Sequence, residues 1–395
     1  MIWYRVQVGA YAFPKSAERV KIDLIEKGFK PAIVREELLY KVRVGSFQDK
    51  KKAEKQLARV KKYKEYSKAK IFEWNDGKDL PIIDISGSGP GVAYDYHPRI
   101  DLVCIWHTET HEDMYGDAQV FIEYDRWGTD IVHAVLVDTG MYGSDTIKKL
   151  KALGIKSLDA IVISHAHGDH YGYLDETMKQ FKVGHLYLPC TDGLKKYQPA
   201  YAKALQNKEK KAKALNIPVT YLKGGDHFEV GRIECDCVFQ VPADRLKEHD
   251  DHHFVNNQSI ITMFTLDDVG KVLLTGDLSN PGNDIVMGYY KNWKVALQAD
   301  VAKCPWHADK DGLSVAWIAF IGAISWYWNY HSAKNSGDRN KTTQKLIDGG
   351  VKAERITRNF EDGDVKYSFY EDVWTVSCSK RGTLFAFKSR FGRVN

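Results

Sequence analysis

Long apolar runs are missing from this sequence, and cysteines are few. No run approaches the roughly 18–20 apolar residues that a membrane-spanning helix needs, so no membrane span is expected. The first eight residues lack the charged start and apolar stretch of a secretory signal, so export by that route is not expected. Six cysteines in 395 residues do not indicate the disulfide framework of a small secreted domain. Cys235 and Cys237 could bind a metal, but the alternation over 233–238 favours a strand that places both thiols on one face.

What is present fits a globular protein with more than one domain. Hydrophobic residues make up 44% of the chain and charged residues 28%, and 395 residues favour two domains. Residues 1–75 hold 19 Lys and Arg against 9 Asp and Glu, so a basic small region precedes a mildly acidic large one. Two interpretations of this asymmetry stay open: an anionic partner such as nucleic acid or a cell-wall polymer, or a solvated lysine-rich helix face.

The basic region contains an internal repeat. Val6–Tyr11 (VQVGAY) recurs 36 residues later as Val42–Phe47 (VRVGSF). Each copy is followed by a segment with helical periodicity and then by a short strand-like segment, namely Ser16–Lys27 with Pro31–Val34, and Lys50–Lys62 with Lys70–Trp74. The repeat therefore predicts a small α+β domain with a four-stranded sheet and two helices on one face.

This doubled strand–helix–strand unit resembles the SPOR (sporulation-related repeat) family, whose first strand carries V-x-V-G-x-[FY]. The resemblance implies that residues 1–75 bind peptidoglycan glycan strands, and it suggests a cell-envelope or phage-associated protein. The alternative is a ferredoxin-like module with another ligand. Residues 76–97 are rich in turn-forming residues and indicate a linker, which leaves 98–395 as the second domain.

Strands and helices alternate in the second domain, as in a layered α/β protein. A helix is expected over Ser144–Leu153. Strands are expected at Ile100–Trp106, Gln119–Tyr124, Ala134–Val137, Ala160–Ser164, Leu186–Leu188, Ile233–Val238, Ile260–Phe264, Val272–Leu274 and Ile318–Ser325.

The strongest motif begins where a continuous apolar run, typical of a buried strand, ends. His165, His167, Asp169 and His170 lie within six consecutive positions, and imidazole with carboxylate is a donor set that zinc, manganese or iron accepts. His165 and His167 could hold one ion while Asp169 and His170 face a second.

Three more candidates follow other apolar segments. Asp138 could orient a ligand histidine, Asp277 could bridge two ions, and His307 could bind the second ion. Taken singly, each of these signals is weak, because an aspartate at a strand end is often a turn residue.

The ordered set of motifs resembles the metallo-β-lactamase superfamily, and within it the hydrolase domain of DNA-uptake competence proteins. The shared motifs are Gly116–Gln119, Leu136–Gly140, His165–His170, Asn256–Ser259, Leu273–Asp277 and Lys303–Ala308. The resemblance implies a four-layer αββα sandwich and two divalent ions, zinc or manganese. It also implies hydrolysis of a phosphodiester, such as a nucleic acid, by a metal-bound hydroxide. Asp169 would then orient or deprotonate the water. His331, at the cleft rim, could donate a proton to the leaving group, or it is a surface histidine beside a packed aromatic cluster.

Two departures from the family pattern bear on the metal centre. Most superfamily members have a third histidine for the first ion, where this chain has Asn256–Ser259. The loop Glu248–His253 could supply a donor, or it is a solvated polar insertion. Trp306 and Ala308 replace a histidine and a glycine, which puts the second ion in question although His307 remains. Two alternatives therefore stay open: an amide or lactam hydrolase, and a non-catalytic wall-binding protein with a degenerate metal site.

Overall fold

The computed structural model describes most of the chain, in two compact units. It describes residues 3–11, 20–21, 23–24, 27–29, 31–36, 39–47, 49–74, 97–105, 107, 116–125, 127–246, 252–292, 294–329 and 336–391. The units are Met1–Tyr94 and Asp95–Asn395. The expected linker at 76–97 lies almost wholly outside the described residues, so its bounds stay a prediction.

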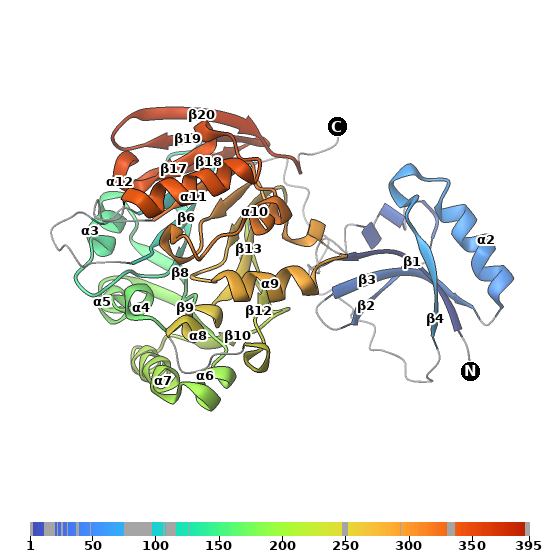
Figure 1. Cartoon of the computed structure of the whole chain (residues 1–395), viewed down its shortest axis with the longest axis horizontal. Coiled ribbons are helices and arrows are strands. Elements are labelled where there is room, and N and C mark those ends of the chain that lie inside the picture. Colours follow the sequence, from blue (N-terminus) through green and yellow to red (C-terminus); the bar gives the residue numbers. More distant parts are fainter. Residues whose placement is uncertain are drawn as a thin grey trace. The chain divides into compact units, whose positions relative to one another are not determined.

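The first unit is a four-stranded antiparallel sheet in the order β2-β3-β1-β4 (Figure 1). Its elements are β1 (Trp3–Tyr11), β2 (Pro31–Glu36), β3 (Leu39–Phe47), α2 (Lys50–Val60), the 3-10 turn η1 (Lys64–Tyr66) and β4 (Lys70–Trp74). In the first copy of the repeat, the described residues 20–21 and 23–24 are helical. The strand–helix–strand order predicted from the repeat is therefore present.

The core of this unit lies between α2 and one face of the sheet. Val6, Val8, Val42 and Val44 are buried together with Ala53 and Val60 of α2. Because side chains alternate along a strand, Gln7 and Arg43, which pair across β1 and β3, lie on the opposite face. Helix α2 begins at the Asp49 carboxylate, which accepts a hydrogen bond from the Lys51 amide at 2.8 Å.

The second unit contains two sheets. The first has nine strands in the order β10-β9-β8-β7-β6-β5-β18-β19-β20. They are β5 (Ile100–Cys104), β6 (Gln119–Tyr124), β7 (Ile131–Val137), β8 (Ser157–Val162), β9 (Lys182–Pro189), β10 (Val219–Leu222), β18 (Val365–Tyr370), β19 (Val373–Cys378) and β20 (Gly382–Lys388). The second has seven strands in the order β11-β12-β13-β14-β15-β16-β17. They are β11 (His227–Val230), β12 (Ile233–Gln240), β13 (Ile260–Leu266), β14 (Gly270–Leu274), β15 (Val301–Lys303), β16 (Ser325–Trp328) and β17 (Ile356–Arg358).

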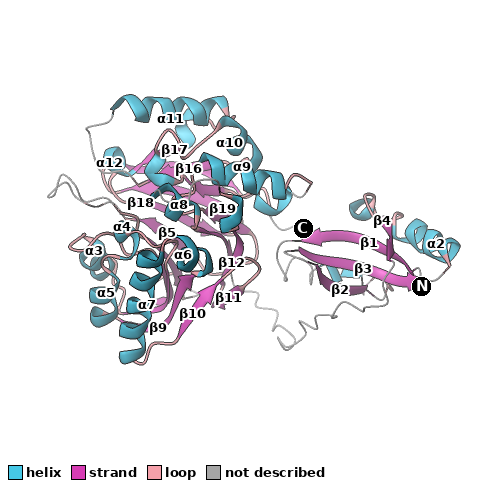
Figure 2. Cartoon of the chain, turned by 60° about the horizontal axis from the view of Figure 1, so that its bottom comes forward, coloured by secondary structure: helices cyan, strands magenta, loops and turns pink. Residues whose placement is uncertain are grey.

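Helices cover the outer faces of the two sheets. Figure 2 shows the strands between a group that includes α3, α5 and α7 and a group that includes α9, α10 and α11. The α-helices are α3 (Thr146–Ala152), α4 (Gly168–Tyr171), α5 (Leu174–Gln180), α6 (Asp192–Tyr197), α7 (Pro199–Ala214), α8 (His252–Asn257), α9 (Asn280–Tyr289), α10 (Val315–Ile321), α11 (Ser336–Asp348) and α12 (Asn359–Asp362). The 3-10 turns are η2 (Ala243–Arg245), η3 (Lys294–Leu297), η4 (Trp306–Ala308) and η6 (Ala353–Arg355). Among the described residues, no helix is long and apolar enough to cross a membrane.

The main core fills the space between the two sheets, as in the predicted αββα sandwich. Phe121 of β6 stacks on Phe264 of β13 with ring centroids 4.2 Å apart. Cys235 and Cys237 of β12 are both buried in this core, which confirms that they share one face of a strand.

One predicted strand is wrong. Ile318–Ser325 was expected to be a strand, but the structure has α10 up to Ile321 and β16 only from Ser325. The Ser314 hydroxyl caps α10 by accepting a hydrogen bond from the Trp317 amide at 3.1 Å. Gly322, with φ of 59°, ends the helix in the left-handed region. Periodicity in so short an apolar run does not distinguish a helix from a strand, and the two caps decide the conformation.

Candidate metal centre

Four strands bring the predicted ligands to one edge of the sandwich. In the first sheet, β7 and β8 are parallel neighbours, and Asp138 and His165 follow their carboxyl ends. In the second sheet, β14 and β15 are parallel neighbours, and Asp277 and His307 follow theirs. The carboxyl ends of parallel strands are where α/β folds place their sites.

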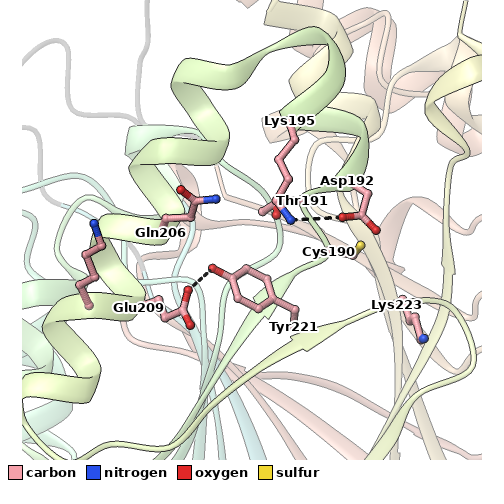
Figure 3. A pocket seen from close by; sticks show the side chains of 9 residues that line it. Cys190, Thr191, Asp192, Lys195, Gln206, Glu209, Tyr221 and Lys223 are labelled. Atoms are coloured by element: carbon pink, nitrogen blue, oxygen red, sulfur yellow. Dashed lines mark hydrogen bonds and ion pairs between the residues drawn. The ribbon is translucent and has the colours of Figure 1, made fainter.

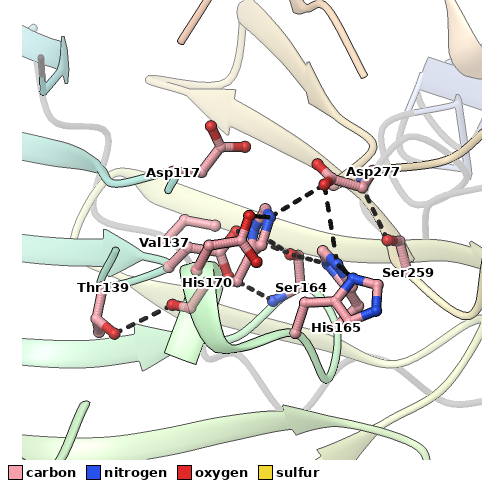
Figure 4. Close-up of polar contacts among 12 residues, drawn as sticks. Asp117, Val137, Thr139, Ser164, His165, His170, Ser259 and Asp277 are labelled. Atoms are coloured by element: carbon pink, nitrogen blue, oxygen red, sulfur yellow. Dashed lines mark hydrogen bonds and ion pairs between the residues drawn. The ribbon is translucent and has the colours of Figure 1, made fainter. Parts of the chain in front are cut away.

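Four of the predicted ligands converge on one point. The Asp277 Oδ2 atom lies 3.2 Å from His170 Nε2 and 3.1 Å from His307 Nε2. His307 Nε2 also lies 3.0 Å from Asp169 Oδ2. Figure 4 shows the His170 and His165 side chains pointing towards Asp277. Asp169, His170, Asp277 and His307 therefore form one donor set, called here the second-ion half.

Each histidine of this half is held from behind by a buried carboxylate. His170 Nδ1 lies 2.9 Å from Asp138 Oδ2, and His307 Nδ1 lies 3.3 Å from Asp117 Oδ1. A carboxylate on one ring nitrogen fixes the orientation of the imidazole and leaves the other nitrogen for the ion. Both Nε2 atoms are consequently directed at Asp277.

His165 and His167 form the first-ion half. His165 Nε2 lies 3.0 Å from His167 Nδ1 and 3.9 Å from Asp277 Oδ2. The other ring nitrogen of His165, Nδ1, lies 3.1 Å from the Ser164 hydroxyl, which donates a hydrogen bond to Asp138 Oδ2 at 2.8 Å. In this half, His165 is therefore supported by the Ser164 hydroxyl, and Asp138 contacts that hydroxyl rather than the His165 ring.

A buried lysine adjoins the centre. Lys303 is 1% exposed, and its Nζ lies 2.5 Å from Asp117 Oδ2 and 3.8 Å from Asp277 Oδ1. Burial lowers the pKa of Lys303, but Asp117 and Asp277 outweigh it and raise that pKa. Asp117 is within 4.8 Å of the donor atoms of His170, Asp277 and His307 and could itself bind an ion. Because it already contacts Lys303 and the far side of His307, we assign it to supporting these side chains.

The two halves differ in the electrostatics of their histidines. Burial lowers the pKa of His170, but the Asp277, Asp169 and Asp138 carboxylates raise it well above its ordinary value. Burial likewise opposes protonation of His307, yet Asp277 and Asp117 raise its pKa well above normal. In the first-ion half, burial lowers the pKa of both His165 and His167. Nearby carboxylates therefore favour protonation of the second-ion histidines, whereas burial disfavours protonation of the first-ion histidines.

Unusual backbone conformations place Asp277 and His307. Gly276 has a φ of 52°, and a Cβ there would lie 2.6 Å from the Ser259 hydroxyl, which accepts a hydrogen bond from the Asp277 amide. Trp306, His307 and Ala308 have φ values of 47°, 50° and 62°, so three successive non-glycine residues are left-handed. The Thr342 hydroxyl donates a hydrogen bond to the Ala308 carbonyl at 2.8 Å and helps to hold this turn.

Comparison with known proteins identifies both units. Residues 4–69 match the SPOR domain family, and residues 133–234 match the metallo-beta-lactamase superfamily. The chain combines a SPOR domain with a metallo-β-lactamase domain. The predicted families and the α/β sandwich are thereby confirmed.

Individual relatives cover only parts of the chain. ComE operon protein 3 of Bacillus subtilis (strain 168) is 28% identical over 229 residues, which are 58% of this chain and 27% of that protein. Ribonuclease J of Sinorhizobium meliloti is 32% identical over 83 residues, 21% of this chain and 13% of that protein. The chain thus spans well under half the length of these relatives. Among solved structures, the peptidoglycan binding domain of the B. subtilis cell wall lytic enzyme CwlC is 28% identical, with a TM-score of 0.18 over 19% of this chain and 92% of that domain.

The structure describes some of the remaining expected site residues and not others. His331 and residues 248–251 lie outside the described residues, so their predicted roles stay predictions. Trp306, which replaces a family histidine, packs edge-to-face on His253 with ring centroids 4.7 Å apart. His307 still reaches Asp169 and Asp277 despite that replacement.

Asp117, Ser164 and Lys303 were not expected from the sequence to be site residues. Asp117 and Lys303 lie within family-like motifs, but nothing in the sequence alone pairs them. A lysine directly after the apolar residues Val301 and Ala302 of a buried strand was the available signal, because lysine is rarely buried unless it is paired.

A separate hollow of about 450 Å³ lies beside α6 and α7. Figure 3 shows Tyr221 pointing to Glu209, which accepts its hydrogen bond at 2.8 Å. Lys195 Nζ lies 3.3 Å from Asp192 Oδ1 in the same hollow. The residues that line this hollow include none of the candidate ligands, so it is distinct from the metal centre.

Proposed function

We propose that this metallo-β-lactamase superfamily protein is a phosphodiesterase that depends on divalent metal ions. The observation that carries the proposal is the convergence of His170 and His307, each held by a buried carboxylate, on Asp277. A carboxylate that contacts the second ring nitrogen is typical of histidines that bind a metal ion.

The residues fit two ions, zinc or manganese. Asp169, His170, Asp277 and His307 would hold one, and His165 and His167 with Asp277 would contribute to the other. Divalent ions at this place lower the pKa of water and stabilise negative charge on a phosphoryl group. The Asp169 side chain is 20% exposed whereas that of Asp277 is 3% exposed, so Asp169 is the carboxylate that can orient a water molecule from the solvent side.

Nucleic acid is the substrate that we favour. One of the two curated relatives is by its name a ribonuclease, and it aligns with a stretch of this chain at 32% identity. Two ions sharing a carboxylate also suit displacement at phosphorus, because they can stabilise the attacking and leaving oxygens. A phosphodiester of a wall polymer has the same reacting group.

Hydrolysis of bis(p-nitrophenyl) phosphate tests the proposal. Metal-free protein resupplied with Mn²⁺, Zn²⁺ or Mg²⁺ should release nitrophenol, and His170→Ala should lower the rate by more than about 100-fold, since it removes a ligand. His185→Ala is the matched control, because His185 is a partly exposed histidine of β9 whose Nε2 lies 2.9 Å from the Thr220 hydroxyl. Bound metal without diester turnover, together with cleavage of nitrocefin, would show an amide or lactam hydrolase instead. No bound metal would show a degenerate site.

We further propose that the SPOR domain binds peptidoglycan glycan strands with the sheet face opposite α2. Arg43 lies on this face, paired with Gln7, and each of the two residues is 5% exposed. Arg43→Ala should lower co-sedimentation with purified peptidoglycan several-fold and leave diester hydrolysis unchanged. Lys55→Ala, at an exposed position of α2, should alter neither. Equal sedimentation of the two variants would contradict this assignment of the face.

A further inference from the structure

The segment Asn256–Ser259 covers the end of α8 and the residues before β13, and three of its residues have structural partners. Asn257 donates to the Ser279 hydroxyl at 2.7 Å and accepts from the Ser279 amide at 3.1 Å. Gln258 donates to the Val241 carbonyl at 3.0 Å. Ser259 accepts a hydrogen bond from the Asp277 amide. These contacts fix the segment against the centre.

Asn256 is different. Its side chain is 1% exposed, and within the described part of the chain its oxygen has no well-aligned hydrogen-bond donor. The side chain nevertheless interacts with the His167 ring. Among the described residues, the side-chain oxygens of Asn280, Asn283 and Asn359 also lack a well-aligned donor, so the interaction with His167 is what distinguishes Asn256.

We propose that the Asn256 side-chain oxygen is the third protein donor of the first-ion half, beside His165 Nε2 and His167 Nδ1. This inference rests on the metal centre of the proposed function. Asn256 lies in α8, next to Asn257, whose bonds to Ser279 anchor the end of that helix. The donor set of this half is then two imidazoles, one neutral amide oxygen and the shared Asp277.

The chemistry of an amide oxygen determines which ion this half accepts. Carbonyl and carboxylate oxygens suit Mn²⁺ and Mg²⁺, whereas three imidazoles suit Zn²⁺. A neutral oxygen also contributes less charge than a carboxylate. The first-ion half should consequently bind more weakly than the second-ion half and favour Mn²⁺ over Zn²⁺.

Titration of the metal-free full chain with Mn²⁺ tests this, with free Mn²⁺ followed by its electron paramagnetic resonance signal. The unaltered protein should bind two equivalents, one tight and one weak. Asn256→Ala should weaken the weak equivalent by about 10- to 100-fold and leave the tight one unchanged. Asn256→Asp, which keeps the shape and adds charge, should tighten the weak equivalent. Asn256→His should shift it towards Zn²⁺.

Asn283→Ala is the matched control, since it removes another buried asparagine whose oxygen lacks a well-aligned donor among the described residues and whose amide donates a hydrogen bond to the Gly312 carbonyl at 2.9 Å. It should lower the melting temperature and retain both equivalents. Two equivalents with unaltered affinities in both Asn256→Ala and Asn256→Asp would overturn the inference and leave the metal centre standing. Binding of no Mn²⁺ by the unaltered protein would instead overturn the metal centre and, with it, the Asn256 assignment.

Discussion

The two halves of the metal centre share Asp277 but are supported in different ways. In the second-ion half, His170 and His307 each face a buried carboxylate, Asp138 or Asp117. In the first-ion half, His165 faces the Ser164 hydroxyl. Direct carboxylate support raises the basicity of a ligand histidine more than a hydroxyl does. The affinity of a metal site therefore depends on the atoms that support its ligands as well as on the number of ligands.

Removal of the shared ligand should have the largest effect, because it breaks both halves at once. Asp277→Asn should lower the affinity for both ions, and the rate of diester hydrolysis, by more than about 100-fold. Metal content by mass spectrometry after dialysis would measure the first effect. If Asp277→Asn kept one equivalent of metal, Asp277 would serve a single half and would not be shared by the two.

A smaller and unequal effect should follow from the supporting residues. Asp138→Asn removes the charge behind His170 and should weaken the tight ion by about 10- to 100-fold. Ser164→Ala removes a neutral hydroxyl that lies 3.1 Å from His165 Nδ1 and 3.4 Å from His170 Nδ1, so it should weaken each ion by less than about 10-fold. Calorimetric titration distinguishes the two ions. Equal losses in the two variants would show that the halves are equally supported.

The smallest effect should be opposite pH slopes in the stability of the metal-free protein. The raised pKa of His307 stabilises the fold below the unfolded value near 6.5, and this contribution is lost as pH rises through the folded pKa. The lowered pKa of His165 destabilises the fold as pH falls below about 6.5, since only the unfolded chain takes up the proton.

Urea unfolding in EDTA at pH 5, 6.5 and 8.5 measures these slopes. Relative to the unaltered protein, His307→Gln should lose most stability at low pH, whereas His165→Gln should gain there. The difference in the free energy of unfolding between each variant and the unaltered protein should change by at most about 1.4 kcal/mol per pH unit. If the stability differences of both variants changed with pH in the same direction, the prediction would be contradicted.

The sequence predicted the families, the doubled repeat and most strands because these depend on local pattern. Gln119–Tyr124 has the bounds that were expected, and the repeat gives matching strands in β1 and β3. The strand predicted at Ile318–Ser325 was wrong, because the conformation of this segment depends on the caps at Ser314 and Gly322 rather than on its apolar residues. The supporting contacts could not be predicted for a related reason. Lys303 and Asp117 are 186 positions apart, and only the packing of the two sheets brings them within 2.5 Å.

The left-handed turn at Trp306–Ala308 has a kinetic consequence. Non-glycine residues in this conformation cost about 1 kcal/mol or more each, and that strain is released whenever the turn opens. Opening would carry His307 away from Asp277 and remove one donor of the second-ion half. The rate at which the second-ion half releases an ion should therefore depend on how often this turn opens.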